Sequence, residues 1–142
     1  MNALEIRNLT KDYGEFTLDN LNLTLPCGCI MGLIGENGAG KSTTIKLILD
    51  MIHRDEGTIT LLGRDNREDM LLTKQDIGVV LDEVGIPSCL SAVQVGKIMT
   101  HTFTKWDKEL YAQYLKKLNL PEKRPFKEYS KGMKMKLGIA VA

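Results

Sequence analysis

One nine-residue segment constrains this chain more than any other feature. Residues 35–43 read Gly-Glu-Asn-Gly-Ala-Gly-Lys-Ser-Thr and match the pattern G-x-x-x-x-G-K-[ST] in full. The glycines let backbone N–H groups converge on an anion, because a Cβ would obstruct that approach. The apolar residues 30–34 precede the segment and a helical pattern follows it, so the loop meets a helix N-terminus, where negative charge is favoured. The sequence predicts a polyphosphate-binding loop, and a plain glycine-rich turn is the alternative.

Three polar side chains of this loop have distinct expected roles. Lys41 is placed to reach the β- and γ-phosphates of a nucleotide, Ser42 to offer its hydroxyl to Mg²⁺, and Thr43 to bond the α-phosphate. The residues expected to surround the phosphates are Gly35, Glu36, Asn37, Gly38, Ala39, Gly40, Lys41, Ser42 and Thr43.

The patterns around the loop predict several strands. Residues 4–10 and 16–25 alternate apolar and polar side chains, as half-buried antiparallel strands do, and residues 58–62 read as a further strand. The continuous apolar runs at residues 30–34 and 77–81 predict buried parallel strands.

Helical spacing follows the loop and dominates the second half of the chain. A helix of about three turns is predicted after the loop, with an apolar stripe formed by Ile45, Ile48, Leu49 and Ile52. The chain reads as helical from Ser91 onward, and a last helix begins near Ser130. A central helix is indicated by an apolar row made of Leu110, Tyr111, Tyr114, Leu115 and Leu118. We place a boundary near residue 85, which gives an ATP-binding core at 1–85 and a helical subdomain at 86–142.

Composition narrows the possible classes of protein. The chain has 142 residues, of which 43% are hydrophobic and 26% charged, so it can form about one folded domain. Its apolar stretches are too short to span a membrane, and the first residues do not resemble a secretion signal. A net charge of +1 gives no bias towards nucleic acid. Ten Lys or Arg against four Asp or Glu from Lys105 onward indicate a solvated helical face, with contact to phosphate or anionic lipid as the alternative.

The chain contains three cysteines, Cys27, Cys29 and Cys89. A metal site would need a second Cys or His pair beside Cys27 and Cys29, and no such pair follows at metal-site spacing. We interpret the three cysteines as unpaired thiols of a reducing cytoplasm.

Two motifs resemble those of one family. Residues 36–43 resemble the loop of ATP-binding cassette (ABC) proteins, and residues 129–133, Tyr-Ser-Lys-Gly-Met, are similar to the ABC signature. That signature usually reads Leu-Ser-Gly-Gly-Gln; Ser130 and Gly132 match it, whereas Lys131 and Met133 depart in the manner common among ABC-2-type exporters. The chain thus resembles the N-terminal part of an ABC nucleotide-binding domain. The resemblance implies an α/β fold: a P-loop NTPase core with an antiparallel β-subdomain and a helical subdomain, truncated before the Walker B strand.

The resemblance also implies roles for residues outside the loop. Tyr13 would stack on adenine, although by itself it could equally be a surface tyrosine in a turn. Ser130 is a good helix N-cap by its chemistry alone, and the resemblance implies that Ser130 and Gly132 face the ATP held by a partner subunit. Residues 77–83 resemble the strand that leads into the Q-loop, with Asp82 where glutamine is usual. Asp82 is a candidate Mg²⁺ ligand, or else Asp82 and Glu83 are charges at a strand end.

The function implied is ATP binding and, in the full-length protein, ATP hydrolysis that powers export through a separate membrane permease. The cofactors would be ATP and Mg²⁺, the partners a second nucleotide-binding subunit in a head-to-tail dimer and the permease, and the location the cytoplasmic face of the cell membrane. No nucleic-acid partner is expected. Alternatives are a non-transport ABC ATPase of the ribosome-associated type and a nucleotide-binding fragment without catalysis.

No catalytic residue is predicted in the sequence given. The Walker B aspartate and the catalytic glutamate of the family have no counterpart in it. The switch histidine follows the signature in the family, whereas His53 and His101 both precede it. We therefore expect this chain alone to lack ATPase activity.

Overall fold

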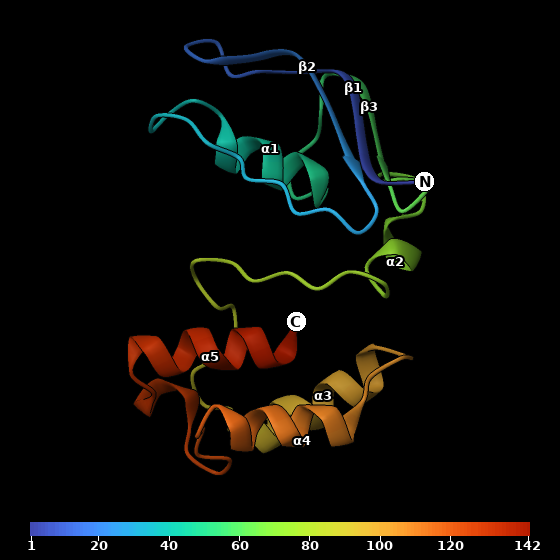
Figure 1. Ribbon diagram of the computed structural model, residues 1–142. Coiled ribbons are helices and arrows are strands. Elements are labelled where there is room, and N and C mark those ends of the chain that lie inside the picture. The colour runs from blue at the N-terminus through green and yellow to red at the C-terminus, as the bar shows by residue number, and fades with distance from the viewer. The chain divides into compact units, whose positions relative to one another are not determined.

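The computed structural model describes residues 1–142, which form two compact units, Met1–Lys74 and Gln75–Ala142 (Figure 1). The division falls after Lys74, ahead of the boundary that the sequence patterns place near residue 85. No helix is long and apolar enough to cross a bilayer.

The first unit is built on a four-stranded antiparallel sheet. Its strands are β1 (Asn2–Asp12), β2 (Thr17–Pro26), β3 (Glu56–Leu61) and β4 (Arg64–Asp65), in the order β2-β1-β3-β4. The strands predicted from alternation in the first 25 residues and from residues 58–62 are confirmed, since each overlaps one of the three long strands. The β1–β2 hairpin is the pairing expected of two alternating segments separated by a short turn.

Strand β1 carries a bulge that keeps its apolar residues on one face. Leu4, Ile6 and Leu9 are all buried, although Leu9 breaks the period-two spacing. The register against both neighbouring strands shifts between Ile6 and the end of β1, where Asn8 adopts a φ of 49° that asparagine tolerates better than most residues. A Cβ on Gly57 of β3 would lie 2.4 Å from the Asn8 carbonyl oxygen, so glycine is required opposite the bulge.

Helix α1 (Lys41–Ile48) follows the glycine-rich loop and lies along one side of the sheet (Figure 1). The prediction of an apolar stripe including Ile45 is wrong in its detail: Thr44 and Leu47 are buried, and Ile45 is 44% exposed. The helix is also shorter than the three turns predicted, because Asp50 takes a left-handed conformation (φ 50°) and ends it. A short helix, α2 (Met70–Thr73), closes the unit.

The two predicted parallel strands do not form. Residues 30–34 and 77–81 have no strand conformation, and Ile30 and Ile34 are fully exposed. A strand exists only where its N–H and C=O groups pair with a neighbour, and neither segment pairs with another strand. Apolar composition alone therefore gave the wrong prediction here.

The second unit is helical, as predicted. It contains α3 (Ala92–Thr102), α4 (Lys108–Lys117), the 3₁₀ helix η1 (Phe126–Glu128) and α5 (Lys131–Val141). Side-chain caps begin the three α-helices. The Ser91 hydroxyl and the Gln94 side chain form a capping box at α3, Asp107 accepts from the Leu110 N–H at α4, and Ser130 caps α5.

The core of this unit is aromatic and aliphatic. Its buried residues are Ala92, Tyr111, Leu115, Leu120, Phe126, Tyr129, Leu137 and Ala140. The Tyr111 hydroxyl donates to the Ala92 carbonyl oxygen (2.9 Å), which fixes α4 against α3. A Cβ on Gly96 would lie 2.7 Å from the Tyr111 ring, so this glycine permits the close approach of the two helices.

Candidate nucleotide-binding site

The glycine-rich loop has the backbone geometry that an anion cradle requires. Gly38 and Gly40 have φ angles of 88° and 91°, in the left-handed region that glycine adopts without strain. Gly40 is also the N-cap of α1 and has no side chain to occupy the free N–H groups of the first helical turn. The Ala39 N–H donates to the Glu36 carbonyl oxygen (3.2 Å) and makes a turn between the loop's two halves. The loop therefore ends on a helix start whose backbone donors are uncapped by any side chain.

Lys41 folds back under the loop. Its Nζ donates to the carbonyl oxygens of Gly35 and Glu36, both at 2.6 Å. It forms no ion pair with a carboxylate, so no salt bridge neutralises its ammonium group. Thr44, one turn further, donates its hydroxyl to the Gly40 carbonyl oxygen (2.8 Å) and pins the start of the helix.

The two hydroxyl-bearing residues of the loop differ in exposure. Ser42 is exposed and Thr43 is half-buried. The Ser42 hydroxyl is an oxygen donor of the kind that Mg²⁺ accepts, and no protein hydrogen bond engages it. No group of three or more His, Cys, Asp or Glu side chains comes together in the chain as a metal site.

The turn of the β1–β2 hairpin lies beside the end of the loop. A Cβ on Gly40 would come within 3.0 Å of the Phe16 ring and 3.2 Å of Leu18, so both side chains rest against this glycine. Tyr13 is in the same turn, where its N–H donates to the Phe16 carbonyl oxygen (2.9 Å). Tyr13 is 52% exposed, and the Lys11 ammonium lies 5.5 Å from the centroid of its ring. The structure thus brings the turn that carries Tyr13 to the loop, with the ring open to solvent.

Two aspartates fix the base of that turn. Asp12 accepts from the Gly14 N–H (2.8 Å) and the Thr17 hydroxyl (2.9 Å), and these bonds lower the pKa of its carboxyl. Asp55 accepts from the Lys11 ammonium and the Asp12 N–H, both at 2.8 Å, and its pKa is lowered in the same way. The turn is therefore held by charge-assisted hydrogen bonds on both sides.

A buried amide that sequence reasoning missed secures the far end of α1. Asn66 is 0% exposed, and its Nδ2 donates to the carbonyl oxygens of Leu47 (2.7 Å) and Ile48 (3.0 Å). Its Oδ1 accepts from the Arg54 guanidinium, which also pairs with Asp65 (3.0 Å). Asn66 lies in a Gly-Arg-Asp-Asn stretch that reads as an ordinary turn, so no sequence signal distinguished it.

The remaining predicted residues belong to the second unit. Ser130 is exposed, and its hydroxyl accepts from the Met133 N–H (3.2 Å); Gly132 is exposed, with open space where a Cβ would lie. Asp82 and Glu83 are exposed in the segment that forms no strand. The structure thus places Tyr13 and the loop in one unit and these residues in the other.

The cysteines are all exposed. Cys27 and Cys29 follow β2 and Cys89 precedes α3, and each is a free thiol. Cys27 and Cys29 have no further Cys, His or carboxylate beside them that would complete a metal site.

Known proteins resemble the chain over nearly its full length. The lantibiotic transport ATP-binding protein SrtF of Streptococcus pyogenes is 38% identical over 143 residues, which cover 98% of this chain and 60% of SrtF. The bacitracin transport ATP-binding protein BcrA of Enterococcus faecalis is 37% identical, over 99% of this chain and 46% of its own. The chain therefore spans 60% or less of the length of these two relatives.

A solved structure shows the same fold. The ATP-binding subunit of an ABC transporter superposes with a TM-score of 0.87 at 24% identity, over 99% of this chain and 61% of that one. The sequence profile of the ABC transporter family matches residues 18–142. The chain therefore belongs to the ABC transporter family.

Proposed function

We propose that this chain is the nucleotide-binding part of the ATP-binding subunit of an exporter, and that it binds MgATP at residues 35–43. The observation that carries the proposal is the Lys41 ammonium, held under the loop by two carbonyl oxygens and neutralised by no carboxylate. A cation in this setting has more to gain from a polyphosphate than from neutral carbonyl groups.

The binding step follows from the loop geometry. Lys41 exchanges the carbonyls of Gly35 and Glu36 for the β- and γ-phosphate oxygens, while the free N–H groups at the start of α1 point at the same anion. Mg²⁺, when bound, neutralises charge between the phosphates; Ser42 supplies the one ligand that this loop offers it. Thr43 bonds the α-phosphate.

Tyr13 is proposed to hold the base. Its ring is exposed in a turn that touches the loop through Phe16, so adenine can lie on it without rearrangement of the hairpin. Stacking of this kind is tolerant of the exact base position and favours the nucleotide over bare polyphosphate.

Calorimetry with MgATP tests the loop. Lys41→Ala should weaken binding by about 3 kcal/mol, roughly a hundredfold in Kd, since two charge-assisted hydrogen bonds are lost. Lys46→Ala is the matched control, because Lys46 is an exposed lysine of the last turn of the same helix and should leave Kd unchanged. Equal affinity of the Lys41→Ala variant and the unsubstituted chain would remove the proposal.

The second anion site is proposed at the start of α5. Ser130 and Gly132 present a hydroxyl and exposed backbone N–H groups there, and in a head-to-tail dimer they would face the nucleotide of a partner subunit. Ser130→Arg should leave MgATP binding by the single chain intact and abolish nucleotide-driven dimerisation of the whole subunit. Dimerisation unchanged in light scattering would contradict this role.

Export is favoured by the names of the relatives. SrtF and BcrA are named for lantibiotic and bacitracin transport, and a 31% identical protein of Streptomyces peucetius for daunorubicin/doxorubicin resistance. We infer a subunit that acts at the cytoplasmic face of the membrane with a separate permease. Co-purification of the whole subunit with a membrane protein, and export that is lost in its Lys41→Ala variant, are the expected results; a subunit that purifies with ribosomes would contradict them.

A further inference from the structure

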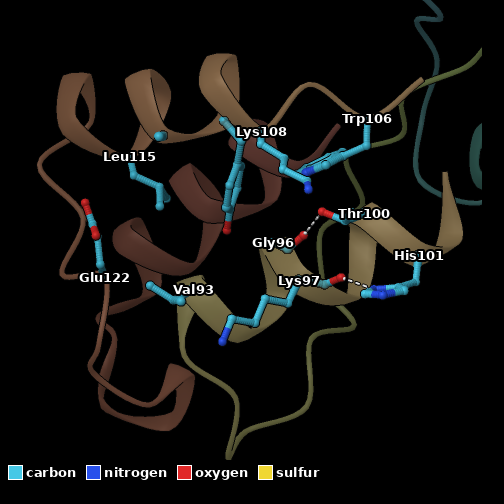
Figure 2. A pocket seen from close by; sticks show the side chains of 11 residues that line it. Val93, Gly96, Lys97, Thr100, His101, Trp106, Lys108, Leu115 and Glu122 are labelled. Atoms are coloured by element: carbon cyan, nitrogen blue, oxygen red, sulfur yellow. Dashed lines mark hydrogen bonds between the residues drawn. The ribbon is translucent and has the colours of Figure 1, made fainter. Parts of the chain in front are cut away.

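The second unit contains a pocket that the nucleotide site does not use. It lies between α3 and α4 and has a volume of about 300 Å³ (Figure 2). Tyr111 and Leu115 of α4 and Val93 of α3 form its apolar walls, and Trp106 lies where the connection between the two helices enters α4. This volume is at the lower end of the range for small-molecule sites and holds roughly ten groups of the size of water.

Trp106 contributes its indole ring to the wall of this pocket. Its indole ring packs against Tyr111 with the ring centroids 5.0 Å apart, and its Nε1 is buried without any hydrogen-bond partner. The Tyr111 hydroxyl, by contrast, already donates to the Ala92 carbonyl oxygen. An indole N–H is a donor only, and a buried donor without an acceptor is unfavourable. This nitrogen is closed to solvent, so the ring offers the pocket packing surface and not a donor.

The charged residues around the pocket are mostly basic. Lys97 of α3 and Lys108 of α4 line it, against the single carboxylate of Glu122. Neither lysine forms an ion pair, and the Lys108 side chain points toward Trp106 (Figure 2). The His101 Nδ1 lies 2.8 Å from the Lys97 carbonyl oxygen and donates to it. The pocket therefore offers apolar walls and two ammonium groups without an ion-pair partner.

We propose that this pocket binds a small amphiphilic anion: an apolar chain or ring of about ten non-hydrogen atoms that ends in a carboxylate. The apolar part would lie on Tyr111 and Leu115, and the carboxylate would pair with one of the two lysines that line the pocket, Lys97 or Lys108. The pocket lies wholly within the second unit, so the proposal does not depend on nucleotide binding at the loop.

Trp106 is the only tryptophan of the chain, so its fluorescence reports this pocket. We expect octanoate, below its micellar concentration, to change the Trp106 emission saturably, with calorimetry as the second measurement. Octanol and octylammonium have the same chain length without the negative charge, and both should bind at least fivefold more weakly. Saturation by octylammonium at the same concentration as octanoate would overturn the proposal, as would no saturable binding of octanoate by either method.

Variants distinguish the contribution of charge to octanoate binding from that of the apolar contact. Lys97→Gln with Lys108→Gln should weaken octanoate binding by up to about fivefold, the scale of one partly exposed ion pair. Lys116→Gln with Lys117→Gln, exposed on α4 and outside the pocket, should leave it unchanged. Ala112→Phe should fill the pocket and abolish binding while the circular dichroism spectrum is retained, because Ala112 is exposed. Equal effects of the two lysine pairs, or full binding by the Ala112→Phe chain, would show that octanoate binds elsewhere.

Discussion

Replacement of Asn66 by alanine should destabilise the first unit more than replacement of any other asparagine in that unit. The side chain is completely buried and ties the end of α1 to the sheet through Leu47 and Ile48, while its oxygen meets the Arg54 guanidinium. The Leu47 carbonyl keeps a partner, since the Asp50 N–H donates to it (3.2 Å). In the alanine variant, the Ile48 carbonyl oxygen and one edge of the Arg54 guanidinium lose their hydrogen-bond partner.

The magnitude follows from those losses. An unsatisfied buried group costs about 1–3 kcal/mol, and a hydrogen bond to a charged donor contributes about 1.5–3 kcal/mol. Partial access of water to Ile48, which is half-buried, and the retained Arg54–Asp65 pair reduce the total. We expect the free energy of unfolding of the first unit to fall by about 2–4 kcal/mol.

Amide hydrogen exchange is the assay, because the only tryptophan lies in the other unit and its emission does not follow this one. The protection of Ile6 and Leu9 should drop by about 1.5 to 3 orders of magnitude, which corresponds to the expected free energy. Asn22→Ala is the matched control: Asn22 also bonds to backbone groups, at Asn8 and Asn20, but is exposed. Similar losses of protection in the two variants would refute the reasoning from burial.

Three further changes have defined outcomes. Tyr13→Ala should weaken ATP binding by about 1–3 kcal/mol and leave tripolyphosphate binding unchanged in calorimetry; equal losses for both ligands would mean that the ring does not touch the base. Gly40→Ala should lower both the melting temperature and the ATP affinity, since the new side chain meets Phe16 at 3.0 Å and the residue is left-handed. The control Gly14→Ala (φ 81°, open space) should show only the backbone strain of about 1–2 kcal/mol. Equal melting temperatures of the two variants would contradict this. The pKa of Asp55 is lowered from 3.8, so its contribution to stability is complete above that pH and is lost as the pH falls through the lower folded-state value. Asp55→Asn should therefore flatten the acid unfolding curve below about pH 4 in circular dichroism, and an unchanged curve would contradict this.

Features that depend on local chemistry were predictable from the sequence. The loop at residues 35–43, the hairpin and the cap at Ser130 each follow from a few neighbouring residues whose preferences do not depend on the rest of the fold. The nucleotide-contacting roles of these residues remain predictions.

Features that depend on distant partners were not predictable. The apolar residues 30–34 resemble a buried strand, but a strand needs a neighbour that the segment itself cannot specify. Thr44 lies on the buried face of α1, because the face of a helix that is buried depends on where the neighbouring sheet packs. Asn66 contacts α1 from eighteen or nineteen residues away, and an asparagine in a turn gives no sign of such a contact.

The position of Lys41 has a consequence for selectivity among anions. Any ligand must compete with two backbone oxygens that already hold the ammonium at 2.6 Å, so binding is an exchange of partners instead of the filling of an open site. A singly or weakly charged anion gains little over those oxygens, whereas a triphosphate offers several charged oxygens at once. We therefore expect the loop to bind triphosphates in preference to small, singly charged anions.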